Sequence, residues 1–158
     1  LLGNRGEGWP VIEKVADTAN AALCMEMVGG AEKCLELAVD YAKTRIAFDQ
    51  PIGSYQAIKH ICADMMLTVE SAKSVAYYAA WAMSEGIPEG PEAVSMAKAY
   101  CSDTYRKASG DLIQLLGGIG FTWEHDAHLF FKRARCNEHL FGDAGYHRDR
   151  LVRIKAGV

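Results

Sequence analysis

Apolar residues recur at steps of three and four along most of this chain, the spacing that places them on one face of an α-helix. The first such stretch begins at Pro10, a residue suited to the first turn of a helix, and is predicted to run to about Ile46. Gly29 and Gly30 in its middle would weaken the helix or let another helix approach closely. The apolar positions of this stretch are Ile12, Val15, Ala19, Ala22, Leu23, Met27, Gly30, Cys34, Leu37 and Tyr41.

The segment around Pro51 interrupts this pattern, because proline cannot continue a helix and disfavours one at the preceding residue. Ser54 is a good N-cap for a second helix, which is expected to end at Gly86. No run has the strict alternation of a strand, and short loops between long helices imply antiparallel neighbours. The sequence therefore predicts an all-α protein, an up-down four-helix bundle. The later helical segments are expected over residues 91–116, 126–141 and 144–155.

The composition is that of an ordinary soluble domain, since half of the 158 residues are hydrophobic and 23% are charged. The net charge of −3, with lysines and arginines scattered among acids, gives no reason to expect a nucleic-acid partner. No window of about 18 uncharged apolar residues is present, so no membrane partner is expected. The start, LLGNRGEGWP, lacks an initiator methionine and the features of a signal peptide, so we expect a fragment of a longer protein.

The cysteines are five in number and form no CxxC pair, which indicates buried free thiols rather than disulfides. Free thiols are typical of a reducing compartment, so a cytoplasmic location is expected. None has a recognisable base partner at a suggestive spacing, which disfavours a catalytic thiol. The cysteines are Cys24, Cys34, Cys62, Cys101 and Cys136.

Three glycines fall within four positions just after the third predicted helix. Gly117 and Gly118 follow Leu116 and would suit a helix C-terminus, where positive φ is common. A helix cap does not explain the third glycine, Gly120. A run of three glycines would also let the backbone pass close to a flat or anionic group. No strand precedes the run and no GK[ST] follows it, so it is neither a Rossmann fingerprint nor a P-loop. A helix cap and a cofactor contact both remain open.

Arg45 and Phe48 lie where the first predicted helix ends. The arginine either neutralises the C-terminal helix dipole or grips a phosphate or carboxylate. In the first case the phenylalanine would fill the core.

The histidines near the start of the fourth predicted helix are candidate metal ligands. Glu124 and His128 are four residues apart, with His125 between them, but HExxH is absent. No second Glu-x-x-His appears either, so no metal is expected.

Two motifs in order carry a resemblance to a known family. The first is Arg45-x-x-Phe48-x-Gln-Pro-Ile-Gly, preceded by YAKT, and the second is Gln114-x-x-Gly-Gly-x-Gly-Phe, extended as GFTWEH and FKRA. Together they resemble the C-terminal domain of the acyl-CoA dehydrogenase flavoproteins, over essentially the whole chain. The resemblance implies that residues 1–9 end a preceding middle β-domain or linker and that residues 10–158 form the helical bundle domain. It also implies that an N-terminal helical domain and the middle β-domain are missing from this chain.

The resemblance further implies FAD as cofactor, lying at a subunit interface. Arg45 would contact its pyrophosphate and Phe48 its adenosine side. The implied activity is α,β-desaturation of an acyl-CoA thioester to the 2-enoyl-CoA, with electrons passed to an electron-transfer flavoprotein. The implied assembly is a homo- or hetero-oligomer, with a dimer of dimers (a tetramer) expected. The other implied cofactor contacts are Tyr55, Gln56, Gln114, Gly117 and Gly118.

The chain departs from this family where a catalytic base is needed. The family's glutamate usually stands directly before the glycine of the last loop, where this chain has Phe141, or in the first helix, where it has Ala19. Neither side chain can take a proton. Asp143, two residues from the first position, is the candidate base, although it would also suit the N-cap of the final helix. Asp17 is a poorer candidate, because two residues along a helix turn the side chain by about 200°.

A second interpretation follows from the missing glutamate. The chain would then be part of a non-catalytic subunit that completes the flavin site of a catalytic partner in a heteromeric dehydrogenase. A third, recruitment to other work such as nucleic-acid binding, is disfavoured by the absence of a basic stripe.

Overall fold

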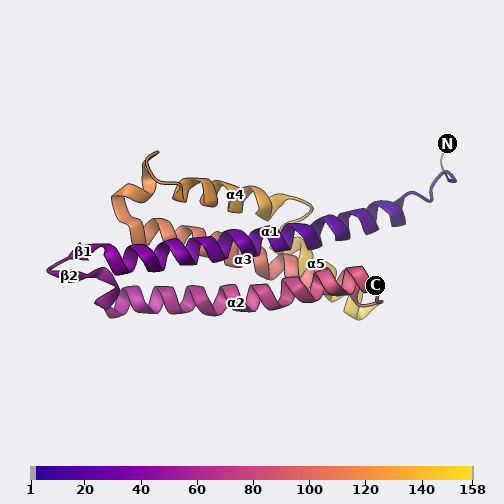
Figure 1. Cartoon of the computed structure of the whole chain (residues 1–158). Helices are drawn as coiled ribbons and strands as arrows, with labels where there is room; N and C mark the ends of the chain where they lie inside the picture. Colours follow the sequence, from indigo (N-terminus) through magenta and orange to yellow (C-terminus); the bar gives the residue numbers. More distant parts are fainter. Residues whose placement is uncertain (1–2, 158) are drawn as a thin grey trace.

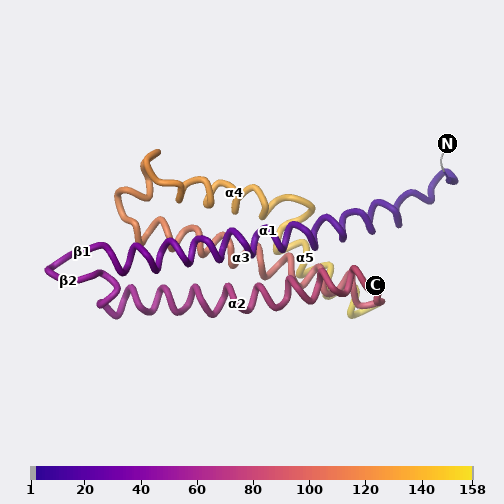
Figure 2. The backbone as a smooth tube through the Cα atoms, viewed as in Figure 1, coloured from indigo at the N-terminus to yellow at the C-terminus, as the bar shows by residue number. Residues whose placement is uncertain are grey.

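Four helices of the bundle run alternately up and down, as Figures 1 and 2 show. The computed structural model describes residues 3–157. Helix α3 contacts each of the other four helices, and the short α5 packs on it. The predicted all-α, up-down bundle is therefore confirmed. The helices are α1 (Trp9–Thr44), α2 (Gln56–Glu85), α3 (Gly90–Leu116), α4 (Ala127–His139) and α5 (Ala144–Ala156), with β1 (Ile46–Ala47), β2 (Gln50–Pro51) and the 3₁₀ turns η1 (Ile52–Ser54) and η2 (Gly117–Phe121).

The connection between α1 and α2 differs from its prediction. Ser54 does not cap α2, because its hydroxyl donates to the carbonyl of Pro51 at 2.7 Å. The N-cap is Tyr55, which makes no side-chain capping bond. The connection also contains the antiparallel hairpin of β1 and β2, whose two-residue strands are too short to show an alternating pattern.

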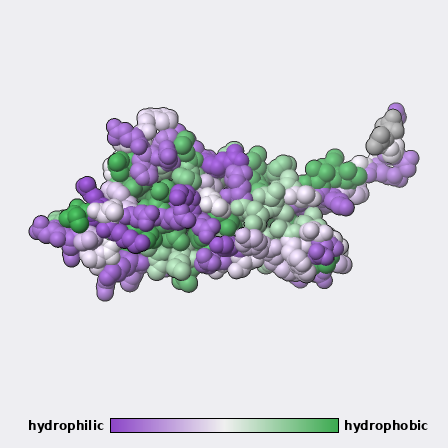
Figure 3. All heavy atoms as spheres, viewed as in Figure 1, coloured by the Kyte–Doolittle hydropathy of each residue, from purple (hydrophilic) through white to green (hydrophobic). Residues whose placement is uncertain are grey.

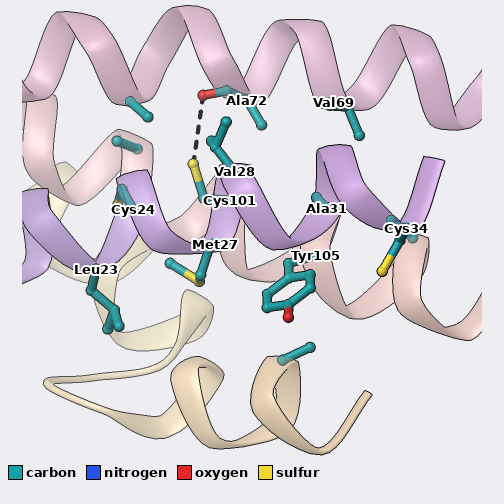
Figure 4. Packing of buried hydrophobic residues seen from close by; sticks show 14 of the residues in the cluster. Leu23, Cys24, Met27, Val28, Ala31, Cys34, Val69, Ala72, Cys101 and Tyr105 are labelled. Carbon is teal, nitrogen blue, oxygen red and sulfur yellow. Dashed lines mark hydrogen bonds between the residues drawn. The ribbon is translucent and has the colours of Figure 1, made fainter. Parts of the chain in front are cut away.

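The core is built largely from small side chains, which let the helices approach closely. Figure 4 shows one layer of it, where the Cys101 thiol donates to the carbonyl of Ala72 at 3.6 Å. Cys24, Cys34 and Cys101 are buried as predicted, whereas Cys62 is half-buried and Cys136 is exposed. Burial raises the pKa of the Cys34 thiol to about 12, which makes it inert as a nucleophile.

The first turns of α1 extend beyond the other helices (Figure 1). Ile12 and Val15 are 59% and 63% exposed there, so their helical spacing did not mark a buried face within this chain. Figure 3 shows hydrophobic atoms gathered along this overhang. Within residues 3–157, no helix has a stretch long and apolar enough to cross a membrane.

Gly29 and Gly30 are neighbours with opposite expected effects on stability. A Cβ on Gly30 would lie 2.4 Å from Cζ of the buried Tyr105, so Gly30→Ala should displace that ring and lower the free energy of unfolding by about 1–3 kcal/mol. Gly29 has nothing within 4 Å of its Cβ position, so Gly29→Ala should raise it by up to about 1 kcal/mol. Urea unfolding of the two variants measures both. Equal effects would contradict the close approach of Tyr105 to α1.

Candidate functional site

The two sequence motifs meet at one end of the bundle. The hairpin after α1 and the 3₁₀ turn after α3 lie together at the left of Figure 1. The hydroxyl of Tyr41, in the last turn of α1, donates to the carbonyl of Leu116, the last residue of α3, at 3.4 Å. Residues some 70 positions apart in the sequence are thereby brought to the same surface.

Phe48 stands at the tip of the hairpin, and 91% of it is exposed. Phe48 and Asp49 have φ of 52° and 63°, and positive φ at both positions is what a type I′ hairpin turn requires. A bulky side chain is uncommon there. The hydroxyl of Tyr55 donates to the carbonyl of Ala47 at 3.0 Å and braces the hairpin. The interpretation that Phe48 fills the core is therefore wrong, because the fold presents its ring to the outside.

Arg45 is fixed by its backbone while its side chain is left exposed. Its amide donates to the carbonyl of Tyr41 at 2.8 Å, and its carbonyl accepts from the amide of Ile52 at 2.9 Å. Within residues 3–157 no carboxylate lies within 4.0 Å of its guanidinium. The guanidinium is therefore available to an anion from outside this chain.

Two of the three glycines of the second motif have a reason within the fold to be glycine, and the two reasons differ. Gly117 has φ of 62° and ends α3, as a capping glycine does. A Cβ on Gly120 would lie 2.9 Å from the carbonyl oxygen of Ile113, so close packing requires it. Gly118 is exposed with open space at its Cβ position, so nothing in residues 3–157 explains the absence of a side chain. Gln114 is also exposed and lines a cavity of about 300 Å³ beside this turn.

Gln56, the remaining candidate in this region, is the first residue of α2 and is exposed. It follows the hairpin brace at Tyr55 directly, so it lies on the same end of the bundle as Arg45.

The two positions that the family resemblance assigns to a base lie close together. The side-chain amide of Asn20, next to Ala19 on α1, donates to the carbonyl of Phe141 at 3.4 Å. Phe141 is 53% exposed and has a left-handed backbone, with φ of 54°. Neither Ala19 nor Phe141 ionises, so this place holds no base of its own.

Asp143 is the N-cap of α5, as one of its two interpretations predicts. One carboxylate oxygen accepts from the amide of Tyr146 at 2.8 Å. That hydrogen bond holds the pKa of the Asp143 carboxyl below its usual range. A carboxylate stabilised in this way is a weaker proton acceptor.

Asp17 is buried and bonded to Arg150 of α5. The two terminal guanidinium nitrogens donate to its two oxygens at 2.5 and 2.8 Å, and one of them also donates to the hydroxyl of Ser95 at 3.1 Å. The pair lines a groove of about 860 Å³ between the start of α1, the α2–α3 turn and α5. Both oxygens of Asp17 are occupied, which further weakens it as a candidate base.

The histidines of the fourth segment have structural partners. Nδ1 of His125 accepts from the amide of Ala127 at 3.0 Å, and the ring of His128 packs edge-on against Trp123. No group of three or more His, Cys, Asp or Glu side chains in residues 3–157 is placed to hold a metal ion.

Sequence reasoning missed Lys98, which is buried, together with His147, beside the loop of Phe141. Lys98 follows Val94 by four residues, so it falls on the apolar face of its helix. A lysine in that register was the available signal for an internal role.

Residues 6–155 match the family described as "Acyl-CoA dehydrogenase, C-terminal domain". The chain is 44% identical over 144 residues to the acyl-CoA dehydrogenase IpdE2 of Mycobacterium tuberculosis, covering 91% of this chain and 42% of that protein. It is 41% identical over 150 residues to the acyl-CoA dehydrogenase FadE34 of the same organism, covering 92% of this chain and 21% of that protein.

The fold is similarly matched among solved structures. Butyryl-CoA dehydrogenase from Megasphaera elsdenii superimposes with a TM-score of 0.93 at 25% identity, covering 98% of this chain and 40% of that one. The chain thus spans about two fifths of the length of IpdE2 and of the solved enzyme. It belongs to the acyl-CoA dehydrogenase family, in which it corresponds to the C-terminal helical domain.

Proposed function

We propose that this chain is the cofactor-contacting domain of an FAD-dependent dehydrogenase that desaturates an acyl-CoA thioester to the 2-enoyl-CoA. The observation that carries the proposal is the gathering of exposed, unpartnered groups at one end of the bundle. There the braced hairpin after α1 and the turn after α3 lie at the same end of the bundle. Membership of the acyl-CoA dehydrogenase family supports it.

The groups at this end fit a dinucleotide in kind. Arg45 offers a guanidinium suited to a pyrophosphate, and Phe48 offers an aromatic face suited to an adenine. The open space at Gly118 lets a ligand approach the backbone, and amide groups in such a turn favour anions. All three are exposed, so we infer that FAD lies between this surface and another chain.

Bound FAD would supply the flavin ring that accepts a hydride from Cβ of the acyl group. This chain would hold it rather than react with it. Arg45 would bind the pyrophosphate, and Phe48 would pack against the adenosine. The remaining contacts would come from Tyr55, Gln56, Gln114 and the backbone of Gly117 and Gly118.

Two candidate functions differ in whether this chain supplies the catalytic base. Asp143 is the candidate if the protein is a self-sufficient enzyme, because it stands two residues from the family's usual position. Its capping bond favours a second candidate function, that of a non-catalytic subunit completing the flavin site of a catalytic partner. Phe141 and Ala19, at the positions that would otherwise carry the glutamate, favour that function too.

Asp143→Asn separates these roles. Asparagine caps a helix as well as aspartate does, so we expect flavin content, unfolding midpoint and turnover of the assembled dehydrogenase to stay close to those of the parent. Asp143→Ala removes the cap and should lower the unfolding midpoint. A loss of turnover of about 100-fold or more in Asp143→Asn, with the midpoint unchanged, would identify Asp143 as the base.

The proposed function is tested on the full-length protein, purified alone and titrated anaerobically with a panel of acyl-CoAs. Bleaching of an oxidised flavin band supports a self-sufficient dehydrogenase. A flavin-free or unbleached protein that gains both properties when a second subunit is added supports the partner-subunit role. A protein that binds flavin in neither state would overturn the proposal.

We further propose an electron-transfer flavoprotein as electron acceptor, a dimer of dimers as assembly and a cytoplasmic location. The exposed cofactor groups support the assembly, because half of each flavin site would come from another chain. The free cysteines support the location, since disulfides are rare in reducing compartments.

A further inference from the structure

Lys98 is the largest of the fully buried side chains, and no carboxylate lies within 4.0 Å of it in residues 3–157. A buried ammonium is costly unless it is hydrogen-bonded. Its Nζ donates to the carbonyl of Gly142 at 2.8 Å and to that of Glu138 at 3.2 Å, with the hydroxyl of Ser102 at 3.4 Å. Two of these three partners belong to the end of α4 and the loop that follows it.

The adjacent carbonyl of the same loop is held as well. Phe141 accepts from the side-chain amide of Asn20 at 3.4 Å and from Nε2 of His147 at 3.0 Å. Both donors are buried. Helices α1, α3 and α5 thus each send one buried donor to the peptide groups of residues 141 and 142.

These contacts hold a conformation that the chain would not adopt unaided. Phe141 has φ of 54°, which is rare for a bulky side chain. Gly142 has φ of 102°, and a Cβ there would lie 2.4 Å from a ring carbon of Tyr146. Such outliers persist only where the surroundings over-determine them, and they cluster at functional sites.

We propose that Lys98 is a positioning residue, whose ammonium holds the carbonyl of Gly142 and thereby helps to fix where the side chain of the preceding residue, Phe141, stands. The placement of that side chain in an acyl-CoA site rests on the proposed function, whereas the hold of Lys98 on the loop does not. The phenyl ring of Phe141 then forms a fixed apolar wall where relatives would present a carboxylate. Lys98 acts on the ligand only through this loop.

The test compares Lys98→Met with Lys107→Met in the full-length protein. Lys107 lies on the same helix but is exposed and paired at the surface with Asp111, so it is a matched control. Amide hydrogen exchange is read at Leu140, Tyr146 and His147, whose N–H groups bond within or beside the loop. We expect Lys98→Met to speed exchange there about tenfold or more and to leave α2 unchanged, while the control changes neither.

A uniform increase over all helices would mean that Lys98 only stabilises the fold, and no increase at the loop would mean that it holds nothing; either result overturns the proposal. Should Lys98→Met not fold, Asn20→Leu removes another donor to the same loop and should give the same local pattern.

A second measurement tests whether the loop that Lys98 holds belongs to the acyl-CoA site. Acyl-CoA affinity is followed by perturbation of the flavin spectrum, using the protein with its partner subunit if one is needed. We expect Lys98→Met to weaken acyl-CoA binding about tenfold with flavin content unchanged. Faster loop exchange without weaker binding would overturn the placement of residue 141 in the acyl-CoA site. If the parent protein binds no acyl-CoA, the proposed function fails. The hydrogen-exchange measurement still shows whether Lys98 holds the loop.

Discussion

Arg45→Ala in the full-length protein is expected to weaken flavin binding about 10- to 150-fold. The guanidinium is the one group of the first motif that can form paired, charge-assisted hydrogen bonds to a pyrophosphate, and bonds of this class contribute about 1.5–3 kcal/mol. Its backbone is fixed by Tyr41 and Ile52, so the side chain can be removed without loosening the hairpin. The flavin-to-protein absorbance ratio after gel filtration, together with flavin titration of the apoprotein, measures the loss.

Arg135→Ala is the control for this experiment. Arg135 is an exposed arginine of α4 that pairs with Glu138, in the part of α4 that lies away from the hairpin. It should therefore retain the flavin content of the parent. Full retention of flavin by Arg45→Ala would count against Arg45 as a phosphate contact, and with it against this end of the bundle as the cofactor surface.

The long helices could be predicted because their apolar spacing reports burial directly. The same spacing misled at Ile12 and Val15, since periodicity marks a face that some surface covers but does not say whether that surface is in this chain. Ser54 shows a second limit. A hydroxyl near a helix start has several hydrogen-bond partners within reach. Here the Ser54 hydroxyl donates to the carbonyl of Pro51, three residues earlier, and does not cap the helix.

The candidate site could be predicted in outline from its two motifs, but not the reasons for individual residues. Three glycines within four positions look alike in a sequence, yet only Gly118 lacks an explanation within the fold. Phe48 could be core or surface until the turn at positive φ placed it at a hairpin tip. Contacts between distant segments, such as the donor from Lys98 to Gly142, depend on packing that local patterns do not contain.

Arg150→Met is expected to destabilise the fold by about 3–5 kcal/mol, because it would leave the carboxylate of Asp17 buried without its partner. Arg153→Met on the same helix removes an exposed ion pair with Asp149 and should cost only about 0–1 kcal/mol. Urea unfolding followed by far-UV circular dichroism compares the two variants.

The double variant Asp17→Leu with Arg150→Met distinguishes the cost of an unpaired charge from the value of the pair. Replacing both partners by apolar side chains removes the buried charges together, so the double variant should be more stable than Arg150→Met alone. Equal or lower stability would mean that the bidentate bond itself, with its link to Ser95, holds α5 against α1. In that case the ion pair would also orient the start of α5, and with it the capped loop that carries Phe141.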